Sequence, residues 1–177
     1  MSILKVNRIE PRTGDTVAIV GFGGVGNVLQ VVQATKEDTF TTTSESFIDI
    51  PGLTLTITPS NSSSKVFINT TIGLASSNLS HIQVRRDGVD VAPGITPPAG
   101  YASGYSCSAS NETNNIESLN INFLDEPNTA SPVVYTVAIK SRESSSMTAI
   151  NRTVQDSTAT NLGIRSKSYI TAMEIGA

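Results

Sequence analysis

The sequence predicts an all-β fold, a jelly-roll-like antiparallel β-sandwich with a short extended segment at its N-terminus. Three observations predict it. Residues 53–58 and 119–123 alternate apolar and polar side chains, and a period of two is typical of a strand with one buried face. Ser, Thr, Asn and Gly cluster between such runs at the spacing expected of turns in a sandwich. No segment shows sustained helical periodicity.

From residue 28 onward, predicted strands follow one another with turns between them. Asp87-Gly88 supplies the positive φ angles of a two-residue hairpin loop. Pro51-Gly52 and residues 59–64 and 126–131 are also predicted as turns, and the Pro-containing stretch 92–101 as an exposed loop. The predicted strands span residues 28–36, 39–43, 46–50, 53–58, 65–73, 80–86, 89–91, 102–108, 117–124, 133–141, 148–152 and 168–175.

Residues 1–27 differ from the domain that follows, residues 28–177. They contain two short alternating runs, 3–9 and 16–20, followed by a glycine-rich stretch. Two short strands cannot bury a core alone, so we expect this segment to be an anchor or oligomerisation segment, joined to the sandwich by a glycine hinge. Its expected interface residues are the apolar members of the two runs: Ile3, Val6, Ile9, Val17 and Ile19.

Composition excludes several classes of protein. The net charge of −3 offers no basic field for nucleic acid. No stretch approaches the ~20 apolar residues of a membrane helix, and charges interrupt the apolar runs near the N-terminus, so neither membrane insertion nor a signal peptide is predicted. Charged residues make up only 15% of the chain. Burial of surface in an oligomer would explain this low value, as would a Ser/Thr-rich coat on a monomer.

The glycine-rich stretch 21–26 fits the GxGxxG pattern of a dinucleotide-binding turn, and Asp49 lies at about the distance expected of a ribose-binding acid. That fold requires a helix directly after the glycines, yet residues 27–36 are rich in β-branched residues. The rest of the chain also lacks βαβ units. We therefore expect a structural hinge, no cofactor and no enzyme, and keep a dinucleotide-binding enzyme as a remote alternative.

The single His81 and single Cys107 support no catalytic site. No second His exists for a zinc site or at triad spacing, and one Cys cannot form an intrachain disulfide. The acids have no calcium-loop spacing, so no metal is expected. Asn-x-Ser/Thr patterns, among them the one at Asn151, are expected by chance in a chain this rich in Asn, Ser and Thr.

Tyr101 and Tyr105 lie among Gly and Ser residues. Flat rings and hydroxyls could form a glycan-binding surface. The same residues could equally pack in a trimer interface, because aromatic residues are enriched at interfaces. Both alternatives remain open at the level of sequence.

A set of stretches along the chain is familiar as a group: residues 2–10, 31–50, 52–59, 64–68, 84–88, 122–127, 135–141, 150–153 and 171–175. Those from residue 31 onward resemble a β-domain common in bacteriophage fibre proteins, and together they cover most of residues 29–175. Residues 2–10 are similar to the N-termini of fibre-like virion proteins of marine and cyanobacterial phages.

The resemblance implies a virion structural protein, assembled in the host cytoplasm, that is usually a homotrimer. Residues 1–27 would attach to other tail or capsid proteins, and the sandwich would face outward, toward host-surface polysaccharide. No catalytic residue transfers from this family. The chain has no extended shaft, so a short tail fibre is expected first. A capsid-mounted fibre, or a decoration or adaptor protein without a host ligand, is the alternative.

Overall fold

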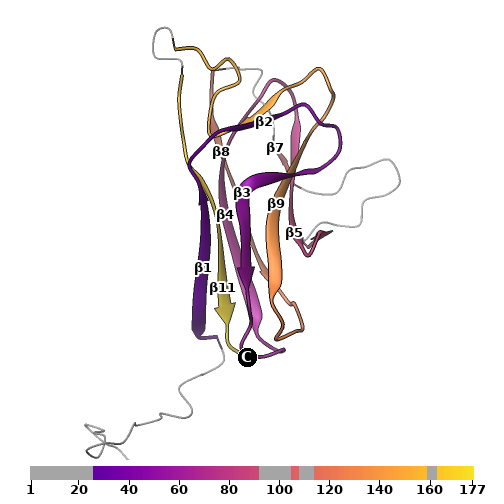
Figure 1. Cartoon of the computed structure of the whole chain (residues 1–177), viewed down its shortest axis with the longest axis vertical. Helices are drawn as coiled ribbons and strands as arrows, with labels where there is room; N and C mark the ends of the chain where they lie inside the picture. The colour runs from indigo at the N-terminus through magenta and orange to yellow at the C-terminus, as the bar shows by residue number, and fades with distance from the viewer. Residues whose placement is uncertain (1–25, 92–104, 108–113, 159–162) are drawn as a thin grey trace, which may run out of the picture.

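The computed structural model describes residues 26–91, 105–107, 114–158 and 163–177, and these residues contain strands and no helix (Figure 1). The strands are β1 (Val28–Lys36), β2 (Phe40–Thr42), β3 (Ile48–Ile57), β4 (Lys65–Ser76), β5 (Ser80–Arg86), β6 (Val89–Asp90), β7 (Tyr105–Cys107), β8 (Glu117–Asp125), β9 (Val133–Ser141), β10 (Thr148–Ile150) and β11 (Ser168–Ile175).

The strands form two antiparallel sheets that pack face to face (Figure 1). In the first sheet the order is β1-β11-β4-β8, and the short strands β2 and β10 extend it beyond the ends of β1 and β11. In the second sheet the order is β3-β9-β5, with β6 and β7 on the outer edge of β5. From β3 to β5, and again from β8 to β10, each successive strand lies in the other sheet, as in a jelly roll. The predicted fold class is confirmed.

Alternate residues of each strand point between the sheets and form the core. In β3, Leu53, Leu55 and Ile57 are buried, whereas Thr54 and Thr56 are exposed. The alternation seen in the sequence is therefore the inside-outside pattern of the sandwich. The core comprises Ile50, Leu53, Leu55, Ile57, Val66, Ile68, Ile72, Leu74, Ile82, Val84, Ile121, Phe123, Val133, Tyr135, Val137, Ile139, Ile150, Ile170 and Ala172.

Four predicted strands have the predicted bounds: β1, β5, β9 and β11. The turn predicted at Pro51-Gly52 is wrong, because β3 continues through both residues. The register against β9 shifts between Asp49 and Thr54, and Gly52 has a φ of +85°. Glycine accepts this conformation, and an edge strand tolerates the missing N–H of a proline. The dipeptide therefore forms a bulge in a continuous edge strand.

The predicted hairpin turn at Asp87-Gly88 is confirmed. These residues join β5 to β6 with φ angles of 50° and 83°, as a two-residue loop requires. Asp87 also fixes the turn against β9: its N–H donates to the Val134 carbonyl at 2.9 Å, and its Oδ1 accepts from the Val134 N–H at 3.0 Å.

The two ends of the described sandwich lie side by side (Figure 1). The Gly26 N–H donates to the Gly176 carbonyl, and the Gly176 N–H donates to the Asn27 carbonyl, both at 2.8 Å. The chain thus enters the sandwich beside the point at which it leaves.

Near this end, Glu174 is fully buried on β11. Its carboxylate accepts hydrogen bonds from the Ser60 N–H at 2.7 Å, the Ser60 hydroxyl at 2.6 Å and Gln30 Nε2 at 2.6 Å. Burial raises the pKa of Glu174, but these hydrogen bonds outweigh it and lower the pKa to about 2. A buried negative charge therefore holds the β3–β4 loop against β1 and β11.

Candidate interaction surfaces

The residues predicted as sites fall largely outside the described part of the chain. Ile3, Val6, Ile9, Val17 and Ile19 lie outside it, as does Tyr101. Tyr105 lies in β7, where its backbone pairs with Ile82 of β5, and its side chain lies outside the described residues. The anchor and the tyrosine surface therefore stay predictions, and the described residues offer other surfaces.

The outer face of the sheet β1-β11-β4-β8 has no charged side chain over three consecutive rows. Strand register places one residue of each strand in each row, and the alternation of buried positions directs these side chains away from the core. We call this surface the uncharged face. Its rows are Val31–Met173–Phe67–Leu124, Gln33–Thr171–Asn69–Asn122 and Thr35–Tyr169–Thr71–Asn120.

The first row of the uncharged face is entirely apolar. Val31 is 56% exposed and Leu124 is 49% exposed, at the two edges of the sheet. Phe67 and Met173, between them, are partly buried. Four strands at a spacing of about 4.8 Å carry the row across roughly 14 Å. Large apolar side chains aligned in this way on a solvent face are typical of a contact surface.

The other two rows are held by hydrogen bonds between neighbouring strands. Gln33 Nε2 donates to Thr171 Oγ1 at 2.9 Å, and Asn69 Nδ2 donates to Asn122 Oδ1 at 2.6 Å. In the third row, the Thr71 hydroxyl donates to Asn120 Oδ1 at 2.7 Å. These polar groups already have hydrogen-bond partners within the sheet. A second surface could therefore pack over them and leave fewer polar groups unsatisfied than if they bonded only to water.

The outer face of the second sheet has the opposite character. The Lys140 Nζ lies 5.0 Å from the centre of the Phe47 ring, and the Arg85 guanidinium lies 5.5 Å from it. His81 pairs directly with Lys140 across β5 and β9. Burial lowers the pKa of His81, and the charges of Lys140 and Arg142 lower it further. We call Phe47, His81, Arg85, Lys140 and Arg142 the cationic cluster.

Asp49, considered as a ribose-binding acid, lies on β3 and pairs with Arg85 at 3.5 Å. The helix that a dinucleotide site needs after the glycines is absent, because residues 28–36 form strand β1. Strand β1 thus takes the place of the helix that follows the glycines in a dinucleotide-binding turn.

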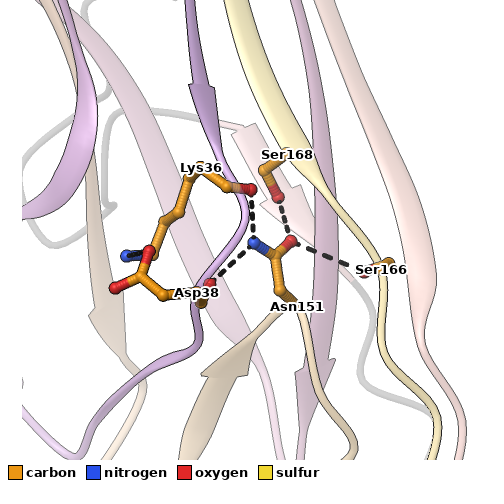
Figure 2. Close-up of polar contacts among 5 residues, drawn as sticks. All are labelled: Lys36, Asp38, Asn151, Ser166 and Ser168. Atoms are coloured by element: carbon orange, nitrogen blue, oxygen red, sulfur yellow. Dashed lines mark hydrogen bonds and ion pairs between the residues drawn. The ribbon is translucent and has the colours of Figure 1, made fainter.

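A group of buried polar contacts joins the start of the loop between β1 and β2 to the connection between β10 and β11 (Figure 2). Asn151, which is 0% exposed, donates through Nδ2 to the carbonyls of Lys36 and Asp38, both at 2.9 Å. Its Oδ1 accepts from the Ser168 hydroxyl at 2.6 Å and from the Ser166 hydroxyl at 3.5 Å. Asn151 is therefore a structural tie, and its amide is not accessible for glycan attachment in the folded chain.

Lys36 lies in the same group, with its side chain buried and its Nζ 2.8 Å from Asp38 Oδ1. The hydrogen bond from Lys36 lowers the pKa of Asp38, which is itself exposed. The stem of Lys36 lies under the bulge, close to Gly52. The pair thus compensates a buried ammonium where β1 meets β3 and has the role of a structural contact.

Four buried hydroxyls meet where the two sheets converge: Ser76, Ser80, Ser141 and Thr148. Thr148 Oγ1 lies 2.6 Å from the Ser80 hydroxyl and 2.9 Å from the Ser141 hydroxyl. His81 follows Ser80 on β5 and therefore points to the opposite face of the sheet. These hydroxyls are hydrogen-bonded to one another, so the group has the role of a structural contact between the sheets.

Among the described residues, no group of three or more His, Cys, Asp or Glu side chains could hold a metal ion. The described residues also contain no helix long and apolar enough to cross a membrane.

No protein-family model matches the chain, and no curated protein matches it in sequence. The two outer sheet faces therefore carry the functional argument.

Proposed function

We propose that this chain is a fibre-type virion structural protein of a bacteriophage, in which copies of the chain associate through the uncharged face and residues 1–27 and display the sandwich for host attachment. The observation that carries the proposal is the apolar row Val31–Met173–Phe67–Leu124, in register across four strands. Interface cores are depleted in charged residues, and this face has none over three rows.

Burial of the apolar row on the uncharged face is too small to hold a trimer together by itself. Full burial of one large apolar side chain is worth roughly 1.5–3 kcal/mol, and about half of Val31 and Leu124 is already covered. The row therefore supplies only a few kcal/mol, whereas association costs about 4 kcal/mol or more. A stable trimer thus requires the further apolar contacts that we assign to residues 1–27.

An assembled fibre would present three sandwiches from one attachment point. Linked copies of a weak site gain avidity because each later binding event is intramolecular. Such an arrangement suits adsorption to a repetitive host surface. A decoration or adaptor protein would use the same assembly face without a host ligand.

The proposal is tested by the mass of the purified full-length chain in solution, measured by sedimentation or light scattering. We expect a trimer, and we expect Val31→Asp combined with Leu124→Asp to shift the mass toward the monomer because charges would enter the contact. The matched control is Val89→Asp, an exposed apolar residue beside the β5–β6 turn (66% exposed). A monomeric wild type, or an equal shift in the control, would overturn the proposed assembly.

Attachment is tested separately, by binding of the labelled trimer to host cells. Binding that competes with phage adsorption supports the fibre. A trimer that binds no host cell would instead favour the decoration or adaptor protein.

A further inference from the structure

We infer that the cationic cluster on the outer face of β5 and β9 binds an anionic polysaccharide, through the carboxylate or sulfate groups along its chain. This inference rests on the proposed attachment function for its purpose. Its argument comes from side chains on the sheet that the uncharged face does not use.

Cations are gathered on this face against their mutual repulsion. The Arg85 guanidinium and the Lys140 ammonium lie 5.5 Å and 5.0 Å from the centre of the same Phe47 ring, and two like charges held this close repel each other. Burial, and then the charges of Lys140 and Arg142, lower the pKa of His81, so the imidazole adds no charge of its own at neutral pH. A bound anion would relieve this repulsion, so the arrangement favours a negative ligand.

Nearby carboxylates neutralise the cluster only in part. In the described part of the chain, Arg85 pairs with Asp49, but Lys140 and Arg142 form no ion pair. Two acids lie in adjacent turns: Glu45 accepts from the Ser144 N–H, and Glu143 accepts from the Ser146 hydroxyl. Both keep their negative charge, but in the described part of the chain neither forms an ion pair with Lys140 or Arg142. Lys140 therefore has a charge available to a ligand.

The cations are also held in place before any ligand binds. The Phe47 ring lies within cation–π distance of both Arg85 and Lys140. The Arg85 Nε donates to Gln83 Oε1 at 3.2 Å, which fixes its guanidinium further. Side chains that are ordered in advance lose less conformational freedom on binding, and this favours affinity.

The charge of the whole chain favours a polysaccharide over a nucleic acid. The net charge is −3, so a densely charged duplex would be repelled by the remainder of the surface. A polysaccharide with one anionic group per repeat places fewer charges along its chain. It can contact the few cations of this cluster without a wide basic field.

The inference is tested by calorimetry on the full-length protein with dextran sulfate as the probe, and with neutral dextran and a short DNA duplex as comparisons. We expect dextran sulfate alone to bind, more weakly at high salt. Lys140→Gln should weaken binding about fivefold, the upper range for one exposed ion pair, and Lys140→Arg should retain it. The matched control is Lys65→Gln, because Lys65 pairs with Glu126 at 2.6 Å on the other sheet.

Three results would overturn the site: no binding of dextran sulfate, equal weakening by Lys140→Gln and Lys65→Gln, or equal binding of the duplex. Thermal melting of each variant shows whether a loss reflects unfolding. Because solution mass tests the assembly and calorimetry tests the cluster, either idea can fail alone. A trimer that binds no polyanion would refute the polysaccharide site and leave the assembly standing. A monomer that binds the polyanion would refute the assembly and leave the site standing.

Discussion

The hydroxyl of Tyr135 donates a hydrogen bond to Oδ2 of Asp125 at 2.5 Å, and this contact joins β9 of one sheet to β8 of the other. The same oxygen accepts from Arg86 Nη1, also at 2.5 Å. Burial raises the pKa of Tyr135, and the hydrogen bond to Asp125 raises it further, so the hydroxyl keeps its proton. One carboxylate oxygen thus connects three strands across the core.

Tyr135→Phe should lower the free energy of unfolding by roughly 1.5–3 kcal/mol, the range for a hydrogen bond to a charged group. Urea denaturation at neutral pH measures the change. Tyr169→Phe, on the uncharged face, is the control, and a substitution there should stay within about 0.5 kcal/mol. Equal losses in the two variants would show that the inter-sheet contact contributes nothing specific.

The buried carboxylate of Glu174 should make the free energy of unfolding depend on pH. Its pKa is about 2 in the folded chain, against 4.5 for an unperturbed glutamate. Because the folded value is the lower one, the stabilisation is fully present above pH 4.5 and is lost as the pH falls toward 2. A shift of this size corresponds to about 3 kcal/mol.

Urea denaturation between pH 7 and pH 2 tests this dependence. Glu174→Gln should be less stable than wild type at pH 7 and should lose less stability on acidification. Glu117→Gln, at an exposed position on β8, should follow the wild-type profile. If the stability of Glu174→Gln falls with pH below 4.5 as steeply as that of the wild type, another group causes the loss of stability in acid.

Asn151 has a φ of 61° and uses its amide for four hydrogen bonds. A glycine at position 151 can adopt this backbone conformation, but it leaves the buried hydrogen-bond partners of Asn151 unsatisfied. We therefore expect Asn151→Gly to lower the free energy of unfolding by roughly 2–4 kcal/mol. Asn151→Ala should lose about 1 kcal/mol more, because its Cβ disfavours the left-handed region. Asn128→Gly is the control, since Asn128 is exposed with a φ of 53°. Urea midpoints rank the three variants, and an equal effect at both positions would contradict the structural role.

Substitutions at Gly73 and Ser166 should have coupled effects on stability. A Cβ at position 73 would lie 2.1 Å from the Ser166 hydroxyl, so Gly73→Ala forces that side chain to move and should lose about 1–3 kcal/mol. In a Ser166→Gly background the loss should be much smaller. A double-mutant cycle in urea measures this coupling. If the effects of Gly73→Ala and Ser166→Gly on the free energy of unfolding add within about 0.5 kcal/mol, the close contact between the two positions does not cause the loss.

Periodicity predicted the strands well because each pattern is local. The buried and exposed positions of β3 and β8 follow from apolar alternation within residues 53–57 and 119–123, and the Asp87-Gly88 turn follows from two residues. Pro51-Gly52 misled the prediction because the same dipeptide serves a turn or an edge bulge, and only the pairing with β9 distinguishes them.

The uncharged face could not be predicted because its rows come from strands distant in the sequence. Val31, Phe67, Leu124 and Met173 become neighbours only through register, and no local pattern fixes that register. The signal present in the sequence was the absence of Lys, Arg, Asp and Glu at alternate positions of four strands. Asn151 was passed over in the same way, as a chance glycosylation pattern, because its partners lie on other segments.

The pairing of Gly26 with Gly176 has a practical consequence for anyone who engineers this chain. A fluorescent label or peptide fused after Ala177 would emerge beside the proposed attachment segment and crowd it. Cargo meant to point away from the particle belongs in the turns at the opposite end of the sandwich, such as the exposed residues 143–145 between β9 and β10 (Figure 1).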